Sequence, residues 1–385
     1  EQLGLRTEKG FAITGVKAYL NEDKKENASL ALLGELDALR IPEHAFANPE
    51  TNAAHCCGHH AQMAGVFGAA LALTVPEIAE KLDGQVVFFA TPAEEYGEIE
   101  FKNQLREQGK IRYGGGKCEL LRIGAFDDID LCLTHHIRPG NEILVGSGTG
   151  NGFVSKVIRV LGKASHAAGA PEKGVNALSA ASLGLQALGL NRETFRDEDC
   201  VRVHPIITKG GNLVNVIPDE VVVETLVRGK TIEAFTDAAK KTDRSFKAGA
   251  IAMGAKVEIS TLPGYLPTLA EEALPELKHA AEISASGIPV IEASGHAGGS
   301  TDVGDVQHLM PVYTFNTGGV KGGLHQIDFE VTDEEEAYIV TAKMFALAAY
   351  GLLKEKAQRS RELVDQYEPV FKNSAEYVEF MEQFD

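Results

Sequence analysis

Apolar and polar positions follow two rhythms in the first part of the chain. Short continuous apolar runs over 28–36, 85–92 and 130–137 predict strands that are buried on both faces. Between them, the Ala-rich apolar stretch over 62–73 predicts a helix. Strands that alternate with crossover helices predict an α/β domain with a mixed, mostly parallel sheet and helices on both faces. In such sheets, ligand sites gather at the carboxyl ends of the strands.

The order of predicted elements changes at about residue 153. From there the sequence predicts a strand, a helix, two strands, a second helix and a final strand, over 153–162, 174–190, 201–210, 220–229, 231–254 and 256–264. This βαββαβ order is typical of a ferredoxin-like unit. Because the earlier pattern then resumes, we expect residues 153–263 to be a domain inserted into a discontinuous domain of residues 1–152 and 264–385.

The two ends of the chain carry further signals. The segment 331–353 predicts a long helix with Thr332 or Asp333 as its N-cap and acidic residues in its first turn, where they suit the helix dipole. The first residues read as the end of a helix that leads into a strand. Since the chain also begins without Met, we expect that an upstream segment is missing from it.

Composition and charge narrow the class of protein. With 385 residues, of which 44% are hydrophobic and 24% charged, the chain is expected to form two or three globular domains. Its 55 acidic and 37 basic residues give a net charge of −18, which disfavours nucleic acid and anionic membranes as partners and favours a small ligand. No apolar run approaches the ~20 residues of a membrane span. Five cysteines, two of them adjacent, indicate a reducing compartment, and we expect the cytoplasm.

The densest chemical signal is the segment His-Cys-Cys-Gly-His-His over 55–60, directly before the predicted helix. Cys thiolates and neutral His side chains are preferred ligands of zinc and related divalent ions. Cys57 and His59, separated by one glycine, can point into one site from a tight loop. An isolated Cys-Gly-His is more often a buried thiol beside a capping histidine, so this segment alone leaves both interpretations open.

Three further clusters carry similar groups at strand ends or before the final helix. They are Glu94 with Glu95, His135 with His136, and His325. Each alone has a structural interpretation, either an exposed acidic loop or a histidine satisfied in the core. Together they are hard to explain as core, because such groups are costly to bury unless they are paired or coordinated. The combined set favours metal-assisted hydrolysis, and five or so ligands suit a pair of ions better than one.

Several motifs, in order and spacing, resemble the M20 metallopeptidase family. They are LGELDALRIPE, AAHCCGHHAQMAGVFGAA, TPAEE, GKASHAAGAPEKGVNALSAA, GGNLVNVIPDEV and the GGSTDVGDV segment with its later FNTGG and His. The most similar subgroup is that of amidohydrolases that cleave N-acyl amino acids, aminobenzoyl-glutamate and similar amide conjugates. The resemblance covers nearly the whole chain, and its motifs are specific to the family. Only the family's usual N-terminal segment is absent from this sequence.

This resemblance implies roles in a metal site. The metal ligands that it implies are Cys57, His59, Glu95, His136 and His325, with His135 as the alternative to His136. Glu94 resembles the general base, and Asp37 resembles the aspartate that orients a ligand. The implied cofactor is a divalent metal, Zn²⁺ or Mn²⁺, as one or two ions.

The motifs also depart from the family pattern at three positions. Glu35 stands where other branches of the family have a metal-binding His. His60 replaces the Asp or Asn that usually follows Cys-Gly-His, which leaves open a changed metal preference or an additional ligand. Arg40 replaces the proline of the Asp-Ala-Leu-Pro motif, which we interpret as a local change.

The inserted domain resembles the lid that closes on the substrate in this family and often forms a dimer interface. His166 resembles the lid histidine that stabilises the developing oxyanion. The residues that the resemblance assigns to substrate binding are Asn215, Arg228, Gly298, Gly299 and Ser300. We therefore expect a homodimer that assembles through the lid and a small-molecule amide as substrate.

The sequence leaves the exact reaction open within this class. The leading hypothesis is an enzyme that removes an acyl group from an amino acid or a related amide conjugate, and a dipeptidase or carboxypeptidase is the alternative. A catalytically silent relative that binds metal or ligand is a hypothesis of another class, and Glu94 argues against it because a silent protein has no need of a general base. A dinucleotide enzyme is disfavoured because no G-x-G-x-x-G follows the first strands.

Overall fold

The structure, a computed structural model, describes residues 2–384 and consists of two compact units. Unit 1 contains the segment that ends at Thr149 together with Thr268–His296 and Thr301–Val378. Unit 2 contains Gly150–Pro267, Ala297–Ser300 and the segment that begins at Glu379. The sequence-based boundaries were 152/153 and 263/264, and that division assigned both the 297–300 segment and the C-terminal residues to the first domain.

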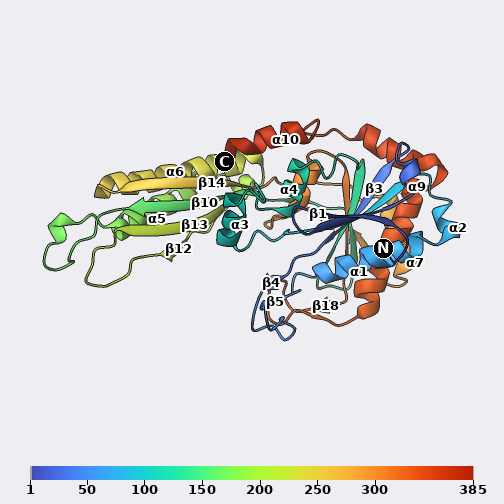
Figure 1. Ribbon diagram of the computed structural model, residues 1–385, viewed down its shortest axis with the longest axis horizontal. Coiled ribbons are helices and arrows are strands. Elements are labelled where there is room, and N and C mark those ends of the chain that lie inside the picture. Colours follow the sequence, from blue (N-terminus) through green and yellow to red (C-terminus); the bar gives the residue numbers. More distant parts are fainter. Residues whose placement is uncertain (1, 385) are drawn as a thin grey trace. The chain divides into compact units, whose positions relative to one another are not determined.

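A twisted sheet of eight strands forms the centre of unit 1 (Figure 1). In spatial order its strands are β1 (Arg6–Phe11), β2 (Gly15–Leu20), β6 (Gln85–Thr91), β3 (Ser29–Glu35), β7 (Leu131–Ile137), β17 (Val312–Thr317), β8 (Ile143–Val145) and β15 (Val290–Glu292). The four central strands β6, β3, β7 and β17 run parallel to one another. Their carboxyl ends therefore meet at one edge of the sheet, as the alternation of strands and helices predicted.

The N-terminal residues do not form the helix end that the sequence suggested. β1 and β2 are an antiparallel hairpin, and β2 pairs antiparallel with β6. The alternating Arg-Thr-Glu-Lys of β1 belongs to an edge strand with one exposed face, because its residues are exposed or only partly buried. The prediction failed because the opening segment is too short to show a helical period.

Helices cover both faces of this sheet. On one face, α1 (His59–Leu73), α7 (Pro275–Ser284) and α9 (Thr341–Gln366) enclose a core with alternate residues of the central strands. In β7, Leu131 and Leu133 belong to this core, whereas the Cys132 side chain between them contacts Met310 on the other face. The remaining helices of unit 1 are α2 (Pro76–Ala79), α3 (Ile99–Glu107), α4 (Gly116–Arg122) and α8 (Val303–Gln307).

The long C-terminal helix begins near its expected cap. Asp333 accepts a hydrogen bond from the Glu336 backbone N–H, so Asp333 serves as the capping residue. A π-helical turn over Glu335–Val340 precedes α9. The helix is interrupted at Lys354–Ala357, where the Asp83 carboxylate accepts a hydrogen bond from the Lys356 N–H.

One helical stretch among the described residues, Glu335–Gln366, has the length and mean hydropathy of a membrane span, which the search for apolar runs did not anticipate. Half of its most apolar window is buried inside the protein. It packs against α1 and α7, and its break after Leu353 interrupts the straight apolar face that a bilayer requires. These contacts are those of a core helix.

Unit 2 has the predicted βαββαβ order. Its main elements are β10 (Gly152–Leu161), α5 (Ala177–Asn191), β11 (Arg202–Val203), β12 (Ile206–Lys209), β13 (Glu220–Gly229), α6 (Ile232–Met253) and β14 (Lys256–Tyr265). The strand predicted over 201–210 is split into β11 and β12 around Pro205, which cannot donate to the ladder. Residues of β13 alternate between buried and partly exposed, so α5 and α6 cover one face of this antiparallel sheet.

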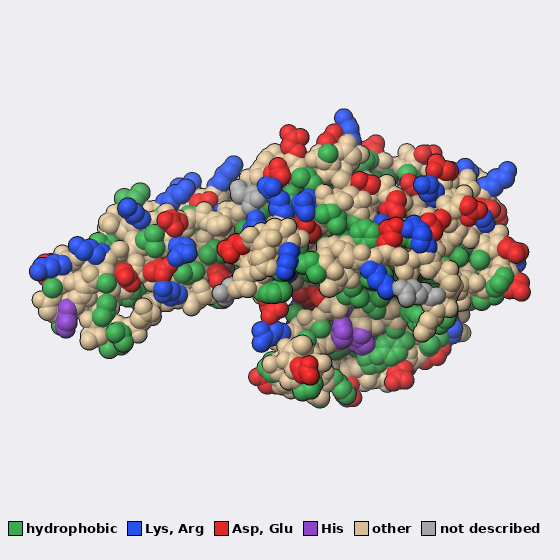
Figure 2. All heavy atoms as spheres, in the orientation of Figure 1, with side chains coloured by type: hydrophobic (Ala, Val, Ile, Leu, Met, Phe, Trp, Pro, Cys, Tyr) green, Lys and Arg blue, Asp and Glu red, His purple; other side chains and the backbone are tan. Residues whose placement is uncertain are grey.

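Short two-residue strands and a C-terminal helix complete the chain. They are β4 (Leu39–Arg40), β5 (Ala53–Ala54), β9 (Thr149–Gly150), β16 (His296–Ala297), β18 (Val320–Lys321), β19 (Glu330–Val331) and α10 (Ser374–Met381). On the face shown in Figure 2, acidic and basic side chains are interspersed rather than gathered into a basic stripe. This distribution suits the negative net charge.

Candidate metal centre

The loop before α1 passes directly against the end of β7. Gly58 is the N-cap of α1 and has φ 91°, and a Cβ at this position would lie 2.1 Å from Cγ2 of Ile137. Only glycine fits this close approach and this backbone conformation. The glycine of the Cys-Gly-His motif therefore brings its two flanking side chains beside the last residues of β7.

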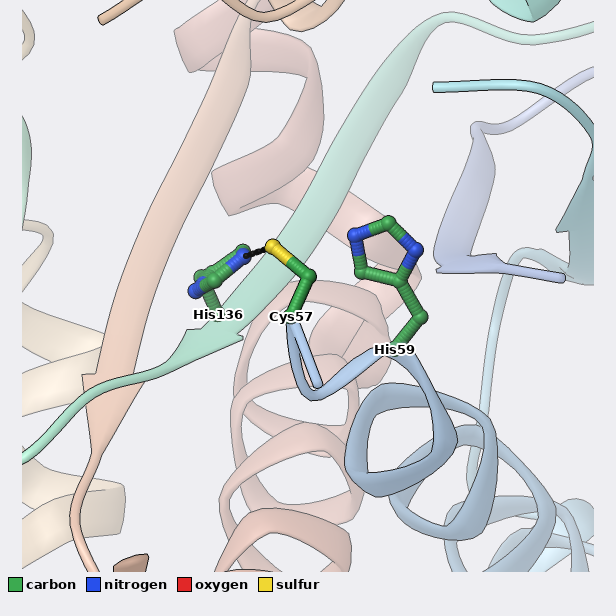
Figure 3. A group of neighbouring side chains, drawn as sticks. All are labelled: Cys57, His59 and His136. Atoms are coloured by element: carbon green, nitrogen blue, oxygen red, sulfur yellow. Dashed lines mark hydrogen bonds between the residues drawn. The ribbon is translucent and has the colours of Figure 1, made fainter. Parts of the chain in front are cut away.

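Cys57 lies at the centre of the cluster. Its Sγ is 3.4 Å from Nε2 of His136 and 3.1 Å from Nε2 of His325. Figure 3 shows the thiol directed at His136, with the ring of His59 on the other side of it. Burial alone would raise the pKa of this thiol, but its contacts with the histidines lower that pKa to about 6. A thiol that loses its proton this readily is suited to metal ligation.

His59 lies between two carboxylates. Its Nδ1 is 3.3 Å from Oδ1 of Asp37, and its Nε2 is 3.2 Å from Oε2 of Glu35. Burial would lower the pKa of His59, but the charges of Glu35 and Asp37 raise it to about 12. Nε2 is buried and has no hydrogen-bond partner. Nδ1 hydrogen-bonds with the backbone carbonyl oxygen of Asp37 at 3.1 Å, so Asp37 fixes the ring from behind through its main chain as well as through the nearby carboxylate.

The two glutamates after β6 have different surroundings. Oε1 of Glu95 is 2.8 Å from Nε2 of His325, and the Glu95 backbone N–H donates to Oδ2 of Asp37 at 2.8 Å. Although burial would raise the pKa of Glu95, His325 lowers it. The pKa of Glu94 is well above its ordinary value, because of burial and the nearby charge of Glu35. Glu95 is therefore held as an anion, and Glu94 is poised to take and release a proton.

His325 reaches the cluster from the loop between β18 and β19. Its backbone has φ 63°, an uncommon conformation for a residue with a Cβ, and its N–H donates to the carbonyl oxygen of Cys56 at 2.9 Å. Hydrogen bonds with Cys57 and Glu95 raise the pKa of its imidazole to about 10. This loop conformation points the side chain toward Cys57.

His135 and His136 separate. Nε2 of His135 contacts Oγ1 of Thr317 at 2.8 Å, and its ring packs on Phe315 and Phe345 in the core. Burial lowers the pKa of His135 well below its usual value, so this ring is neutral. The structure therefore brings His136 to Cys57 and leaves His135 in the core. His60 packs near His55 and Tyr338, and it is not among the ligand groups found in residues 2–384.

These side chains form overlapping groups that can hold divalent ions. The groups are Cys57, His59 and His136; Cys57, Glu95 and His325; and His59, Glu94 and Glu95, with ligand atoms within 4.8 Å of one another in each. Cys57 belongs to the first two groups and can be a shared ligand. The donor set of one thiolate, three imidazoles and a carboxylate fits divalent metal ions. The buried Nε2 of His59 makes no hydrogen bond, although Glu35 lies 3.2 Å from it, and this leaves the nitrogen lone pair available to a ligand.

The residues that the family resemblance assigned to substrate all lie in unit 2. Nδ1 of His166 accepts hydrogen bonds from the backbone N–H groups of Ala168 and Gly169, so the opposite ring nitrogen remains available. The carbonyl oxygen of Asn215 accepts from the Ala167 N–H. Nη1 of Arg228 donates to Oγ of Ser300 at 2.8 Å, which groups Arg228 with the Gly298–Ser300 segment.

Sequence reasoning missed a buried lysine next to the metal ligands. Nζ of Lys117, in the first turn of α4, is 2.6 Å from Glu35 and 2.6 Å from Asp302. A lysine in a Gly-rich segment normally signals a surface turn. The sequence did contain one indication of this lysine's role. Glu35 ends an otherwise buried strand, and a buried carboxylate needs a charge partner.

Comparisons with known proteins give a consistent family. The model of peptidase family M20/M25/M40 matches residues 31–350. The Xaa-Arg dipeptidase of Mus musculus is 28% identical over 311 residues, which are 79% of this chain and 64% of that protein. The N-acetyl-L-cysteine deacetylase of Bacillus subtilis is 25% identical over 371 residues, which are 92% of this chain and 82% of that protein.

A solved structure shares the fold. It is that of a Bacillus subtilis protein described as a dinuclear metal binding peptidase from the M20 family, with a TM-score of 0.63, 23% sequence identity, and coverage of 91% of this chain and 89% of that chain. The chain spans 64% of the length of the mouse dipeptidase. The segment that carries Cys57, Glu95, His136 and His325 lies entirely within the matched range 31–350.

Proposed function

The chain belongs to peptidase family M20/M25/M40, and from that premise we propose that it is a metal-dependent hydrolase that cleaves the amide bond of N-acyl amino acids or related amide conjugates. The observation that carries this proposal is the convergence of Cys57, His136 and His325 within 3.4 Å contacts, with the raised-pKa carboxyl of Glu94 beside them. A cluster of this kind, with a perturbed acid at its edge, is the expected signature of a hydrolytic centre.

Divalent ions bound by these ligands would lower the pKa of water toward neutrality and polarise the carbonyl of the amide. Glu94 would accept the proton of the attacking water and later deliver it to the leaving amine, so that the C–N bond breaks to a carboxylic acid and an amine. His166 would donate a hydrogen bond to the developing oxyanion. Asp37 would fix the ring of His59 throughout the cycle.

We propose two zinc or manganese ions, with Cys57 as the shared ligand. The test is metal analysis of the purified protein, followed by removal with a chelator and restoration with Zn²⁺, Mn²⁺ or Co²⁺. Hydrolysis that returns only with metal, at about two ions per chain, supports the proposal. Turnover that is unaffected by chelation contradicts it.

The substrate is proposed to carry a free carboxylate. Arg228 and Ser300, joined by a 2.8 Å hydrogen bond, offer a guanidinium and a hydroxyl for such a group. The alternative of a dipeptidase has support in the similarity to the Xaa-Arg dipeptidase of Mus musculus, which is 28% identical over 311 residues. A panel of N-acyl amino acids, aminobenzoyl-glutamate and dipeptides distinguishes these activities. A protein that binds metal but cleaves none of them is the silent relative.

We further propose that the chain forms a homodimer through unit 2 and works in the cytoplasm. The supporting observation for the dimer is β12, whose four residues are all exposed, with Ile206 at 61% exposure on this strand. Exposed apolar strands of this type are suited to pairing with another copy. A reducing location suits Cys57, because a ligand thiol must stay unoxidised. Light scattering and cell fractionation test these two points.

A further inference from the structure

Lys117 is a fully buried lysine that no role described above uses. Its side chain is 0% exposed, and Nζ is 2.6 Å from Oε1 of Glu35 and 2.6 Å from Oδ1 of Asp302. Its backbone N–H also donates to Oδ2 of Asp302 at 2.7 Å. A lysine is almost never buried this completely unless its charge is paired. The burial of Lys117 therefore depends on its two carboxylate partners.

Three carboxylates surround this ammonium group. Ligand oxygens of Glu35, Glu94 and Asp302 lie within 4.8 Å of one another. Carboxylates this close together repel one another, and a proton on one of them or a nearby cation relieves that repulsion. Lys117 supplies that charge from within the chain and already contacts two of the three.

The same lysine joins segments that converge from distant parts of unit 1. Glu35 ends β3, Glu94 follows β6, and Asp302 precedes α8. The first turn of α4 is locked against the turn that carries Glu94, because the Gly116 N–H donates to the Ala93 carbonyl oxygen at 2.9 Å. A Cβ at Gly116 would lie 1.5 Å from the carbonyl oxygen of Pro92. Lys117 is therefore held in one place by the backbone around it.

From this cluster a chain of contacts leads to the metal ligands. The second oxygen of Glu35, Oε2, lies 3.2 Å from Nε2 of His59 and accepts a hydrogen bond from Nε2 of Gln62 at 2.9 Å. The first oxygen is taken by Lys117. The position of Glu35 beside the ligand nitrogen of His59 is thus fixed from its far side by the lysine.

We propose that Lys117 is a positioning residue of the reaction centre, a built-in cation that fills the three-carboxylate cluster and holds Glu35 and Asp302 in place beside His59 and Glu94. The effect on turnover rests on the proposed hydrolytic function, whereas the effect on metal binding does not. Residues that support metal ligands in this way typically change metal affinity or activity by roughly 10- to 100-fold when they are replaced. No divalent ion is expected in the cluster while Lys117 is present.

The test compares Lys117→Met with Lys17→Met. Lys17 is a matched control, because it is also buried in unit 1, at 2% exposure, and is paired with Asp128 outside the site. For both variants and the wild type, Mn²⁺ affinity is measured by calorimetry on the metal-free protein, bound metal is counted, and kcat and KM are determined on the best amide substrate. Circular dichroism checks the fold.

We expect Lys117→Met to bind Mn²⁺ roughly 10- to 100-fold more weakly, and to lose kcat with KM within about threefold of wild type, while Lys17→Met keeps all three values. An additional ion bound by Lys117→Met, in the place of the lost ammonium, also supports the proposal. A folded Lys117→Met with wild-type Mn²⁺ affinity and wild-type kcat overturns it.

Two further measurements apply if the variant does not fold or if no substrate is found. If Lys117→Met does not fold, the same affinity is measured on Lys117→Met/Asp302→Asn, which leaves fewer unpaired buried charges, and wild-type affinity there overturns the proposal. If the wild type cleaves none of the amides tested, the proposed function fails, and the Mn²⁺ affinities alone decide the role of Lys117.

Discussion

His135 and His136 are neighbours in β7, yet their side chains serve opposite faces of the sheet. His136 Nε2 lies 3.4 Å from Sγ of Cys57, whereas His135 Nε2 lies 2.8 Å from Oγ1 of Thr317 in the core. Successive residues of a strand point to opposite faces, so only one of the two can reach the metal ligands. Strand geometry decides between two histidines that the sequence left as alternatives.

Replacing each histidine should therefore produce different defects. We expect His136→Asn to weaken metal binding and abolish hydrolysis with little loss of stability. His135→Asn should keep the metal content but lower the free energy of unfolding by about 1 to 3 kcal/mol, because it disturbs buried hydrogen bonds with Thr317 and Thr341. Metal analysis and urea denaturation of the pair check this assignment, and the reverse pattern would falsify it.

Glu94→Gln should separate metal binding from catalysis. Glutamine keeps the shape of Glu94 but cannot carry a proton, so kcat should fall by roughly 10²- to 10⁴-fold while the metal content stays at the wild-type value. Glu98→Gln is the control, because Glu98 is exposed and forms a surface ion pair with Arg40. Activity in Glu94→Gln near that of the control would remove Glu94 from the mechanism.

Cys57→Ser should affect both ion positions at once. Because Cys57 belongs to two of the ligand groups, its loss is expected to weaken the binding of both ions and not of one ion alone. Cys200→Ser serves as the control, since Cys200 lies in unit 2 and is partly exposed. A Cys57→Ser protein that still holds the full wild-type complement of metal would contradict the shared-ligand assignment.

The pH dependence of stability should report on Glu271. Burial raises the pKa of this carboxyl to about 8, and its oxygens accept hydrogen bonds from Thr314 and Gln307. Between about pH 4.5 and 8 the unfolded chain releases this proton and the folded chain keeps it. The contribution of Glu271 to stability is therefore largest below this range and declines as the pH rises through it.

Glu271→Gln should remove this part of the pH dependence. Because Glu271 keeps some exposed surface, we expect the wild type to lose about 1 to 3 kcal/mol relative to the variant between pH 4.5 and pH 8. Thermal or urea unfolding at both pH values measures the difference. Parallel stability curves for the two proteins would show that Glu271 titrates normally.

Arg228→Lys should act on substrate binding. Lysine keeps the charge but cannot form the bidentate, planar contact of a guanidinium with a carboxylate, so KM should rise about 10-fold or more with a smaller change in kcat. Substrates that lack the carboxylate should be insensitive to this change. An unchanged KM for carboxylate substrates would assign Arg228 a purely structural role with Ser300.

The elements of both units follow closely from local sequence patterns. The apolar runs over 28–36, 85–92 and 130–137 correspond to β3, β6 and β7 within one or two residues, because strands buried on both faces leave a continuous apolar signal. The hairpin β1–β2 was missed because its exposed edge strand has no such signal. The split of the 201–210 strand depends on Pro205 and on the partner strand, which a local pattern does not contain.

In the candidate site, too, some residues could be predicted from local sequence and others could not. The spacing of Cys57 and His59 suggests a pair of ligands but leaves a structural interpretation open. The assignment of Glu95 and His325 as ligands depends on the resemblance of their motifs to the family. The ion cluster of Lys117 with Glu35 and Asp302 could not be predicted from the sequence, because a charge network depends on which segments meet in space. Lysine in a glycine-rich turn is normally solvated, and only the fold reveals that this one is enclosed.

The central sheet is completed late in the order of synthesis. β17 lies between β7 and β8, yet it follows the whole of Gly150–Pro267 in the chain. A ribosome thus delivers the main segment of unit 2 before the strand that joins β7 to β8. During that interval the newly made β7 presents an unpaired edge, which is the condition under which nascent chains associate wrongly. Chaperone dependence should therefore be greatest while residues between 150 and 317 are being translated, and slower elongation there would lengthen the exposure.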